Sequence, residues 1–283
     1  MRIGIFAKTF VRPTLKETLD AVTRHGIDCV QFNFTCVGMP SLPDRIDLAV
    51  ADRIREQMEA SQISMAAVSG TFNMAHPNPA VRRDGLKRLR ELASNCRRLG
   101  TCVVTLCTGT RDPENMWRRH PDNSSPQAWR DMLATMDEAV KTAEETKVTL
   151  AFEPEVSNIV DSARKSRALL DEVRSPRLKV VMDAANLFHT GALPRMRPVL
   201  DEAFELLHND IVLAHAKDLN RDGEAGHEAA GQGVLDYDHY LALLRRIGYD
   251  GPLILHGLTE IQVDACIAFL HGKLDRRQEA KSC

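Results

Sequence analysis

Short apolar runs alternate with longer helical patterns about eight times along this chain of 283 residues. We expect strands at 3–6, 29–32, 64–69, 102–106, 149–152, 179–182, 211–215 and 253–255. Eight is the number of strands at which a parallel β/α sheet closes into a barrel, and barrels of this length are common as one domain. The sequence therefore predicts a single (β/α)8 TIM barrel over residues 1–283, with about 275–283 as a frayed tail. An open doubly wound sheet is the alternative, but no Gly-x-Gly-x-x-Gly follows the first run, so dinucleotide binding has no support.

The helical patterns have one apolar and one charged side. Between residues 86 and 99 the apolar positions recur at spacings of three and four, which is typical of a helix packed on a core. The basic residues of the same segment fall on the other side, where they indicate a solvated outer face: Lys87, Arg88, Arg90, Arg97 and Arg98.

The charge balance disfavours partners that need a strongly basic surface. The chain has 37 Lys and Arg against 39 Asp and Glu, a formal net charge of -2, so no overall positive field attracts nucleic acid or an anionic membrane. The apolar run at the start of the chain is too short for the core of a signal peptide. No apolar run in the sequence approaches the length of a membrane span. Seven cysteines without any Cys-x-x-Cys indicate buried free thiols. We therefore expect a cytoplasmic globular protein.

Four successive strand-like runs close on residues that can bind a metal: Glu153, Asp183, His215 and His256. Alone, each has an ordinary interpretation as a salt-bridge partner, a helix-start aspartate or a structural histidine. The carboxyl ends of parallel barrel strands meet at one rim, however, so the four side chains are expected to converge there. Carboxylate and imidazole groups together indicate a divalent cation site.

Other polar candidates lie in connections longer than packing requires. The segments 32–47, 106–126 and 220–236 are expected to fold over the same rim. His76 follows the third run, and Trp117 lies in the longest connection. Trp117 could cover a sugar-sized pocket or simply anchor its own loop.

The order of these motifs resembles the xylose isomerase-like β/α-barrel superfamily of sugar phosphate isomerases and epimerases. The resemblance rests on Glu-Pro at 153–154, on Asp183, on His-Ala-Lys-Asp at 215–218 and on GYDGPLILHG at 248–257. It implies one divalent cation, Mn²⁺ first with Zn²⁺, Mg²⁺ or Co²⁺ as alternatives. Glu153, Asp183 and His215 match three of the family's Glu, Asp, His and Glu ligands. The resemblance also implies a possible homodimer.

The chain departs from the family pattern at the fourth ligand, where His256 replaces glutamate. Either imidazole takes the carboxylate's place at the metal, or His256 acts as an acid in catalysis. Glu260 is a displaced carboxylate four residues further on. A second departure is Asn186, at a position where relatives carry a substrate-binding histidine, and His189 is close by. Arg221 resembles a substrate-contacting basic position in some epimerases of the superfamily, and a surface loop residue is the equal alternative. Lys217 belongs to the His-Ala-Lys-Asp motif.

These residues predict a metal-dependent isomerase or epimerase of ketoses, polyols or sugar acids that works through an ene-diolate, with Glu153 as ligand and base and His256 as ligand and acid. The expected substrate contacts are Asn186, His189, Lys217, Arg221, His76, Trp117 and Glu260. A lyase acting on an oxidised sugar is the main alternative. The endonuclease branch would need imidazole where Thr108 and Asn186 stand, and a non-catalytic binding barrel remains open. The absence of a Gly-rich phosphate cradle favours an unphosphorylated carbohydrate.

Overall fold

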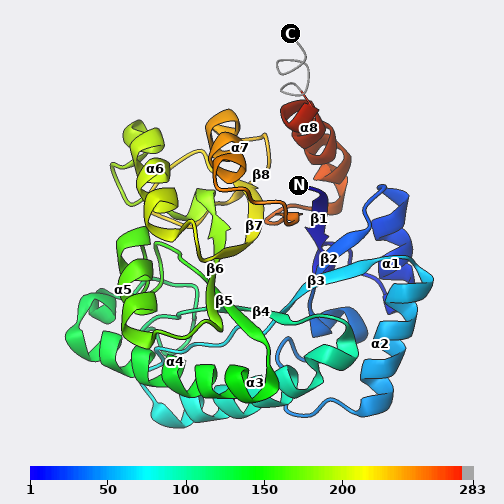
Figure 1. The fold of residues 1–283 in the computed structure, drawn as a ribbon, viewed down its shortest axis with the longest axis horizontal. Helices are drawn as coiled ribbons and strands as arrows, with labels where there is room; N and C mark the ends of the chain where they lie inside the picture. Colours follow the sequence, from blue (N-terminus) through cyan, green and yellow to red (C-terminus); the bar gives the residue numbers. More distant parts are fainter. Residues whose placement is uncertain (276–283) are drawn as a thin grey trace.

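Eight parallel strands close into a barrel in the computed structural model, which describes residues 1–275 (Figure 1). Each strand pairs with the next along the chain, and β9 closes the ring by pairing with both β1 and β7. The barrel strands are β1 Ile3–Phe6, β2 Cys29–Phe32, β3 Ser64–Ser69, β4 Val103–Cys107, β5 Thr149–Glu153, β6 Leu178–Asp183, β7 Ile211–Asp218 and β9 Leu253–Leu255. The predicted single (β/α)8 TIM barrel is confirmed.

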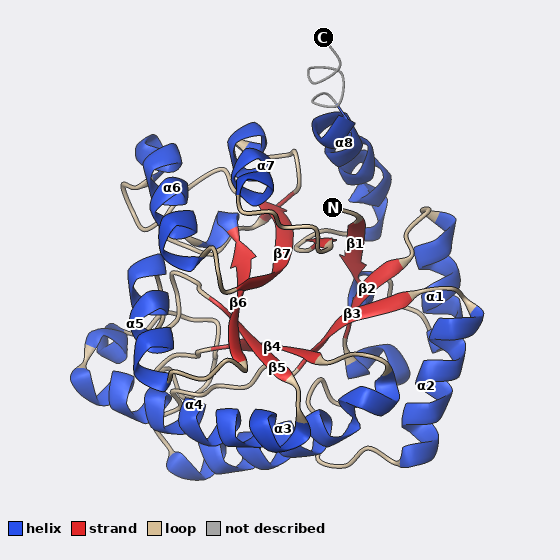
Figure 2. Ribbon diagram, viewed as in Figure 1, coloured by secondary structure: helices blue, strands red, loops and turns tan. Residues whose placement is uncertain are grey.

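Eight α-helices of the described residues surround the strands (Figure 2). Their starts follow ordinary capping chemistry: the Asn78 side chain accepts from the Ala80 amide, and the Ser125 hydroxyl accepts from the Ala128 amide. The helices are α1 Leu15–Arg24, α2 Leu48–Ala60, α3 Pro79–Leu99, α4 Pro126–Thr146, α5 Ala163–Val173, α6 Met196–Leu207, α7 Tyr237–Arg246 and α8 Val263–Asp275. Short 3-10 helices lie at Ala7–Thr9, Phe34–Val37, Pro121–Ser124, Ala184–Asn186, Leu193–Arg195 and Glu260–Gln262. None of the described helices is long and apolar enough to cross a membrane.

The core has two parts. The larger lies between the strands and the helices, and α3 contributes its apolar side to it, as the helical spacing predicts. The smaller consists of Phe6, Cys29, Ala67, Ala151, Val181, Leu213 and Ile254, which come from seven of the eight strands and fill the barrel interior. Side chains alternate along a strand, so residues two positions further on point to the same interior, one layer nearer the carboxyl ends.

β7 extends beyond its predicted end. The predicted run stops at His215, but the strand continues to Asp218 because Lys217 and Asp218 pair antiparallel with the two-residue strand β8, Glu228–Ala229. His215 is therefore inside a strand and not at its close.

Two other expectations concern the cysteines and the tail. Five cysteines of the described residues are free and buried as predicted, but Cys102 precedes β4 and is exposed. The predicted tail at about 275–283 lies outside the described residues, apart from Asp275.

The close contact between α3 and the loop that follows β3 provides a test of the packing. A Cβ atom added at Gly85 would lie 2.1 Å from Cδ2 of the buried Phe72 ring. We expect Gly85→Ala to lower the free energy of unfolding by about 1–3 kcal/mol, despite the better helix propensity of alanine, because the ring has little room to move. Urea denaturation measures the change. Ser94→Ala, on the exposed side of the same helix, should stay within about 0.5 kcal/mol, and equal stability of the two variants would contradict the packing.

Candidate metal centre and substrate cavity

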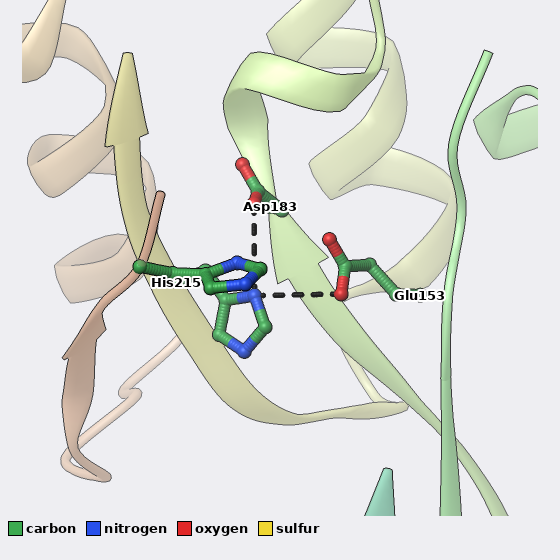
Figure 3. Close-up of side chains that lie close together, drawn as sticks. Glu153, Asp183 and His215 are labelled. Carbon is green, nitrogen blue, oxygen red and sulfur yellow. Dashed lines mark ion pairs between the residues drawn. The ribbon is translucent and has the colours of Figure 1, made fainter. Parts of the chain in front are cut away.

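The four predicted ligands occupy the inward layer directly above the apolar interior. Glu153, Asp183, His215 and His256 each stand two residues after an interior residue, namely Ala151, Val181, Leu213 and Ile254. Strand alternation therefore points all four side chains into the barrel at its carboxyl end. Figure 3 shows Glu153, Asp183 and His215 converging from neighbouring strands. The convergence expected from the sequence is present.

The ligand atoms of the four side chains lie within 4.8 Å of one another. His215 Nδ1 is 3.5 Å from Glu153 Oε2 and 3.6 Å from Asp183 Oδ2. These separations are long for hydrogen bonds. They suit atoms that share one cation, because ligands about 2.1 Å from an ion lie roughly 3–4 Å apart.

Unsatisfied polar atoms in this cluster test whether a cation fits. Asp183 Oδ2, His215 Nδ1 and His256 Nδ1 are buried and have no hydrogen-bond partner among the described residues. The nearby Lys217 Nζ lies 3.1 Å from Asp183 Oδ2, as an ion pair without hydrogen-bond alignment. Buried polar atoms are normally paired, so three orphans in one cluster indicate a missing common partner. Two carboxylates and two imidazoles fit a divalent transition metal.

A relay of hydrogen bonds sets the tautomer of His215. His215 Nε2 donates to Gln31 Oε1 at 2.9 Å, and Gln31 is oriented because its Nε2 donates to Thr105 Oγ1 at 3.2 Å. With the proton held on Nε2, the lone pair of Nδ1 faces Glu153 and Asp183. This is the usual way in which proteins orient a metal-binding imidazole.

Asn186 holds Glu153 and connects it to a covering loop. Its Nδ2 donates to Glu153 Oε1, and its Oδ1 accepts from the Gly226 amide at 2.9 Å. Asn186 is fully buried, at the end of the 3-10 helix that follows Asp183. In this arrangement the Asn186 side chain positions Glu153. The family resemblance, which sets a substrate-binding histidine at this position, did not suggest that role.

This contact predicts the effect of a one-atom change. Asn186→Asp would replace the amide donor with a carboxylate facing Glu153, so we expect metal affinity to fall by about 10–100-fold. Metal-binding calorimetry on chelator-treated protein measures it. The control is Asn209→Asp on an exposed loop, which should bind metal like the wild type. Unchanged affinity in Asn186→Asp would show that Asn186 does not support Glu153.

Charges in the cluster favour an ionised Asp183 and a neutral His256. Burial opposes ionisation of Asp183, but Lys217 and His215 outweigh it and hold the pKa of Asp183 well below its usual range. Burial, with the charges of Lys217 and His215, lowers the pKa of His256 far below its usual value, so His256 is neutral and its Nδ1 can bind metal.

His215 would have to lose a proton before it could bind a cation. Burial opposes its charge, but the carboxylates of Glu153 and Asp183 outweigh burial and raise the pKa of His215 to about 9. A cation entering the site takes the place of that proton, because a ligand histidine is neutral.

A cavity of about 580 Å³ opens above the cluster, a volume that suits a small ligand such as a monosaccharide. Glu153, His256 and Lys217 line it, and Lys217 is only 6% exposed. All three long connections contribute walls, through Ser41, through Trp117 and through Gly226. A separate cavity of about 930 Å³, beside Arg2, His25 and Tyr249, contains none of the four ligand residues.

The lining residues that sequence reasoning missed include Lys8, Gln31 and Glu155. Gln31 had a signal, since it is a polar residue within an apolar strand run, and Glu155 follows Glu153 in Glu-Pro-Glu. Burial, with the charge of Glu153, raises the pKa of Glu155 to about 7. Lys8 gave no signal of its own.

Besides Asn186, four further predicted substrate contacts lie outside the lining of this cavity. His189 Nε2 is 3.7 Å from Asp161 Oδ1 and belongs to another cavity beside α5 and α6. His76 Nε2 lies 3.1 Å from the Pro113 carbonyl. Ion pairs hold the other two, Arg221 with Glu224 and Glu260 with Arg12. By contrast Lys217 and Trp117 line the cavity, and the indole is 50% exposed. A role of the outlying four in substrate binding stays a prediction.

Carboxylates and imidazoles that gather at the carboxyl ends of the strands place this chain among (β/α)8 barrels with a candidate metal site at that rim. This chain belongs to the xylose isomerase-like TIM barrel family, whose pattern matches residues 19–264.

The individual relatives and solved structures that resemble this chain have low sequence identity to it. The L-ribulose-5-phosphate 3-epimerase UlaE of Escherichia coli is 24% identical over 193 residues, which are 68% of this chain and 63% of that protein. The match thus spans less than two thirds of the curated relative. A D-tagatose 3-epimerase-like protein has a similar structure, with a TM-score of 0.78 at 16% identity and 99% of both chains covered. The structure of IolI, which was solved with a zinc atom, is also similar, with a TM-score of 0.74 at 16% identity and with 98% of this chain and 99% of IolI covered. The two structures show a shared fold.

Proposed function

We propose that this chain is a divalent-metal-dependent sugar isomerase or epimerase. The observation that carries the proposal is the convergence of Glu153, Asp183, His215 and His256, with three unpartnered buried atoms, at the floor of a sugar-sized cavity. The name of the UlaE relative, an L-ribulose-5-phosphate 3-epimerase, supports the same reaction class.

The cation would be held by the four converging side chains. Mn²⁺ is our first choice, with Zn²⁺, Mg²⁺ or Co²⁺ as alternatives, and the zinc atom in IolI supports a divalent ion. Such an ion supplies Lewis acidity, polarising a substrate carbonyl and its neighbouring hydroxyl.

Glu153 is the proposed base for the carbon next to that carbonyl. Its Oε1 is held by Asn186, so the carboxylate has a fixed direction towards the cavity floor. Lys217 also lines the cavity and would stabilise negative charge on the substrate oxygens as the proton leaves, in the manner of an ene-diolate. Trp117 would exclude water from above.

Return of the proton distinguishes an epimerase from a lyase. His256 is the proposed acid, but its lowered pKa leaves the imidazole neutral, without the imidazolium proton that an acid would return to the substrate. A lyase acting on an oxidised sugar is therefore the second candidate: its substrate would lose water or carbon dioxide and need no proton on its other face. The specific observation in its favour is imidazole where the family resemblance implies glutamate.

The remaining parts of the proposal concern the setting. A small carbohydrate is the proposed substrate, without nucleic acid or membrane partners, and the cytoplasm is the proposed location. A homodimer is also proposed, and light scattering after size-exclusion chromatography tests it.

The test of function combines metal content with product analysis. We expect about one divalent ion per chain by plasma mass spectrometry, much reduced in His256→Ala, and epimer formation from a ketose panel in D₂O with deuterium on the reacting carbon. Product formed by loss of water or carbon dioxide would reject the epimerase in favour of the lyase. No metal in either protein after incubation with divalent cations would reject the metal centre.

A further inference from the structure

The cavity carries more positive than negative charge once a divalent ion is bound. Its charged lining residues are Lys8, Lys217, Glu153 and Glu155, and Asp183 lies in the adjoining cluster. Two ammonium groups and a divalent ion outweigh the three carboxylates by at least one charge. An imidazole as fourth ligand contributes to this balance, because a ligand histidine is neutral and a carboxylate in place of His256 would cancel the excess.

Lys8 is the lysine of the cavity lining that has no ion-pair partner among the described residues. Lys217 is 3.1 Å from Asp183, whereas Lys8 forms no hydrogen bond or ion pair with any described residue. Its ammonium instead lies 4.5 Å from the centre of the Phe6 ring. It is exposed, so a ligand in the cavity can reach it.

The position of Lys8 relates this charge to the metal cluster. The Phe6 ring centre is 5.2 Å from that of His256, so Lys8 and a metal ligand flank one aromatic ring. A hexose-sized chain can span that distance. Lys8 also lines a second cavity of about 490 Å³ that adjoins the first at Phe6, Lys8, His256 and Gly257. Its location directly after β1, in a 3-10 helix, fixes the backbone at this junction.

We infer that the substrate is a sugar acid whose carboxylate binds Lys8 while its reacting carbons lie at the cluster of Glu153, Asp183, His215 and His256. The inference rests on the proposed function, which places the chemistry at that cluster. One ammonium matches the single charge of a carboxylate, and a charge-assisted hydrogen bond with it is stronger than one with a hydroxyl. A phosphate dianion would call for further donors, and no arginine lines the cavity.

Matched ligands isolate the carboxylate. D-gluconate and D-glucitol differ at one end, carboxylate against hydroxymethyl, and D-glucitol 6-phosphate supplies the phosphate. Affinities of Mn²⁺-loaded protein are measured by calorimetry and by Trp117 fluorescence in a Trp129→Phe background, since the chain has two tryptophans and Trp129 contacts Glu172 on the outer helices. We expect gluconate to bind about tenfold more tightly than glucitol.

Variants assign the preference to Lys8. Lys8→Met removes the charge at similar size and should abolish the preference for gluconate, and Lys8→Arg should retain it. Lys16→Met removes a lysine that pairs with Asp20 on α1 and should leave both affinities unchanged.

Equal affinity for gluconate and glucitol in metal-loaded wild type overturns this inference but not the proposed function. A preference for gluconate that survives in Lys8→Met does the same. Tighter binding of the phosphate, lost in Lys8→Met, overturns the carboxylate assignment. Protein that takes up no divalent ion overturns the proposed function together with the inference.

Discussion

Glu153→Gln is expected to slow proton exchange at the reacting carbon by about a thousandfold. The amide has nearly the size of the carboxylate and keeps an oxygen for the metal, but it cannot accept a proton from carbon. Asn186 donates to Glu153 Oε1, and the amide oxygen of glutamine can take that place. The measurement is the rate of deuterium incorporation from D₂O into substrate, on protein whose metal content has been determined.

The control for this prediction removes a carboxylate elsewhere. Glu172→Gln, on α5, affects a side chain that accepts from Trp129 on the outer helices and should leave exchange unchanged. Wild-type exchange in metal-loaded Glu153→Gln would remove Glu153 as the base and leave it as a ligand. Lost exchange together with lost metal would assign the defect to metal binding.

Asp183→Asn is expected to lower the free energy of unfolding of the metal-free protein by about 3–5 kcal/mol. Asp183 and Lys217 form an ion pair of two nearly inaccessible side chains, 1% and 6% exposed. Removing one charge leaves the other buried without compensation, which costs more than the loss of the attraction alone. Urea denaturation in the presence of a chelator measures the change, and metal content should fall in parallel.

A double variant identifies the cause of that loss. Asp183→Asn combined with Lys217→Met removes both charges, and we expect it to recover most of the stability, because a buried pair replaced by groups without charge is often neutral. A single variant within about 1 kcal/mol of wild type would mean that Lys217 finds another partner. A double variant no more stable than the single one would place the defect in the packing around Asp183.

The alternation of apolar runs and helical patterns was enough to predict the barrel, since local periodicity reports which face of an element is buried. Strand ends at Glu153 and Asp183 predicted two ligands, because parallel strands bring their carboxyl ends to one rim. The end of β7 was missed for a physical reason: the residues after His215 are held by β8, a two-residue strand with no apolar signal of its own.

Contacts between distant segments could not be predicted in this way. The relay from Thr105 through Gln31 to His215 joins residues 74 and 184 positions apart. Asn186, an expected substrate contact, donates a hydrogen bond to Glu153 from 33 positions away, which no local pattern indicated. Arg221 and Glu260 were expected at the substrate too, and each lies in an ion pair outside the cavity lining.

The sequence by itself determined the barrel and the four residues that converge at its rim, because strand alternation decides locally which side chains point inward. Only the tertiary structure decided how those residues are charged and supported. Barrel closure and loop packing set the distances between side chains on different strands, and these distances pair Lys217 with Asp183 and leave Lys8 unpaired at the cavity. Electrostatic interactions depend on distance and burial, which no local pattern records.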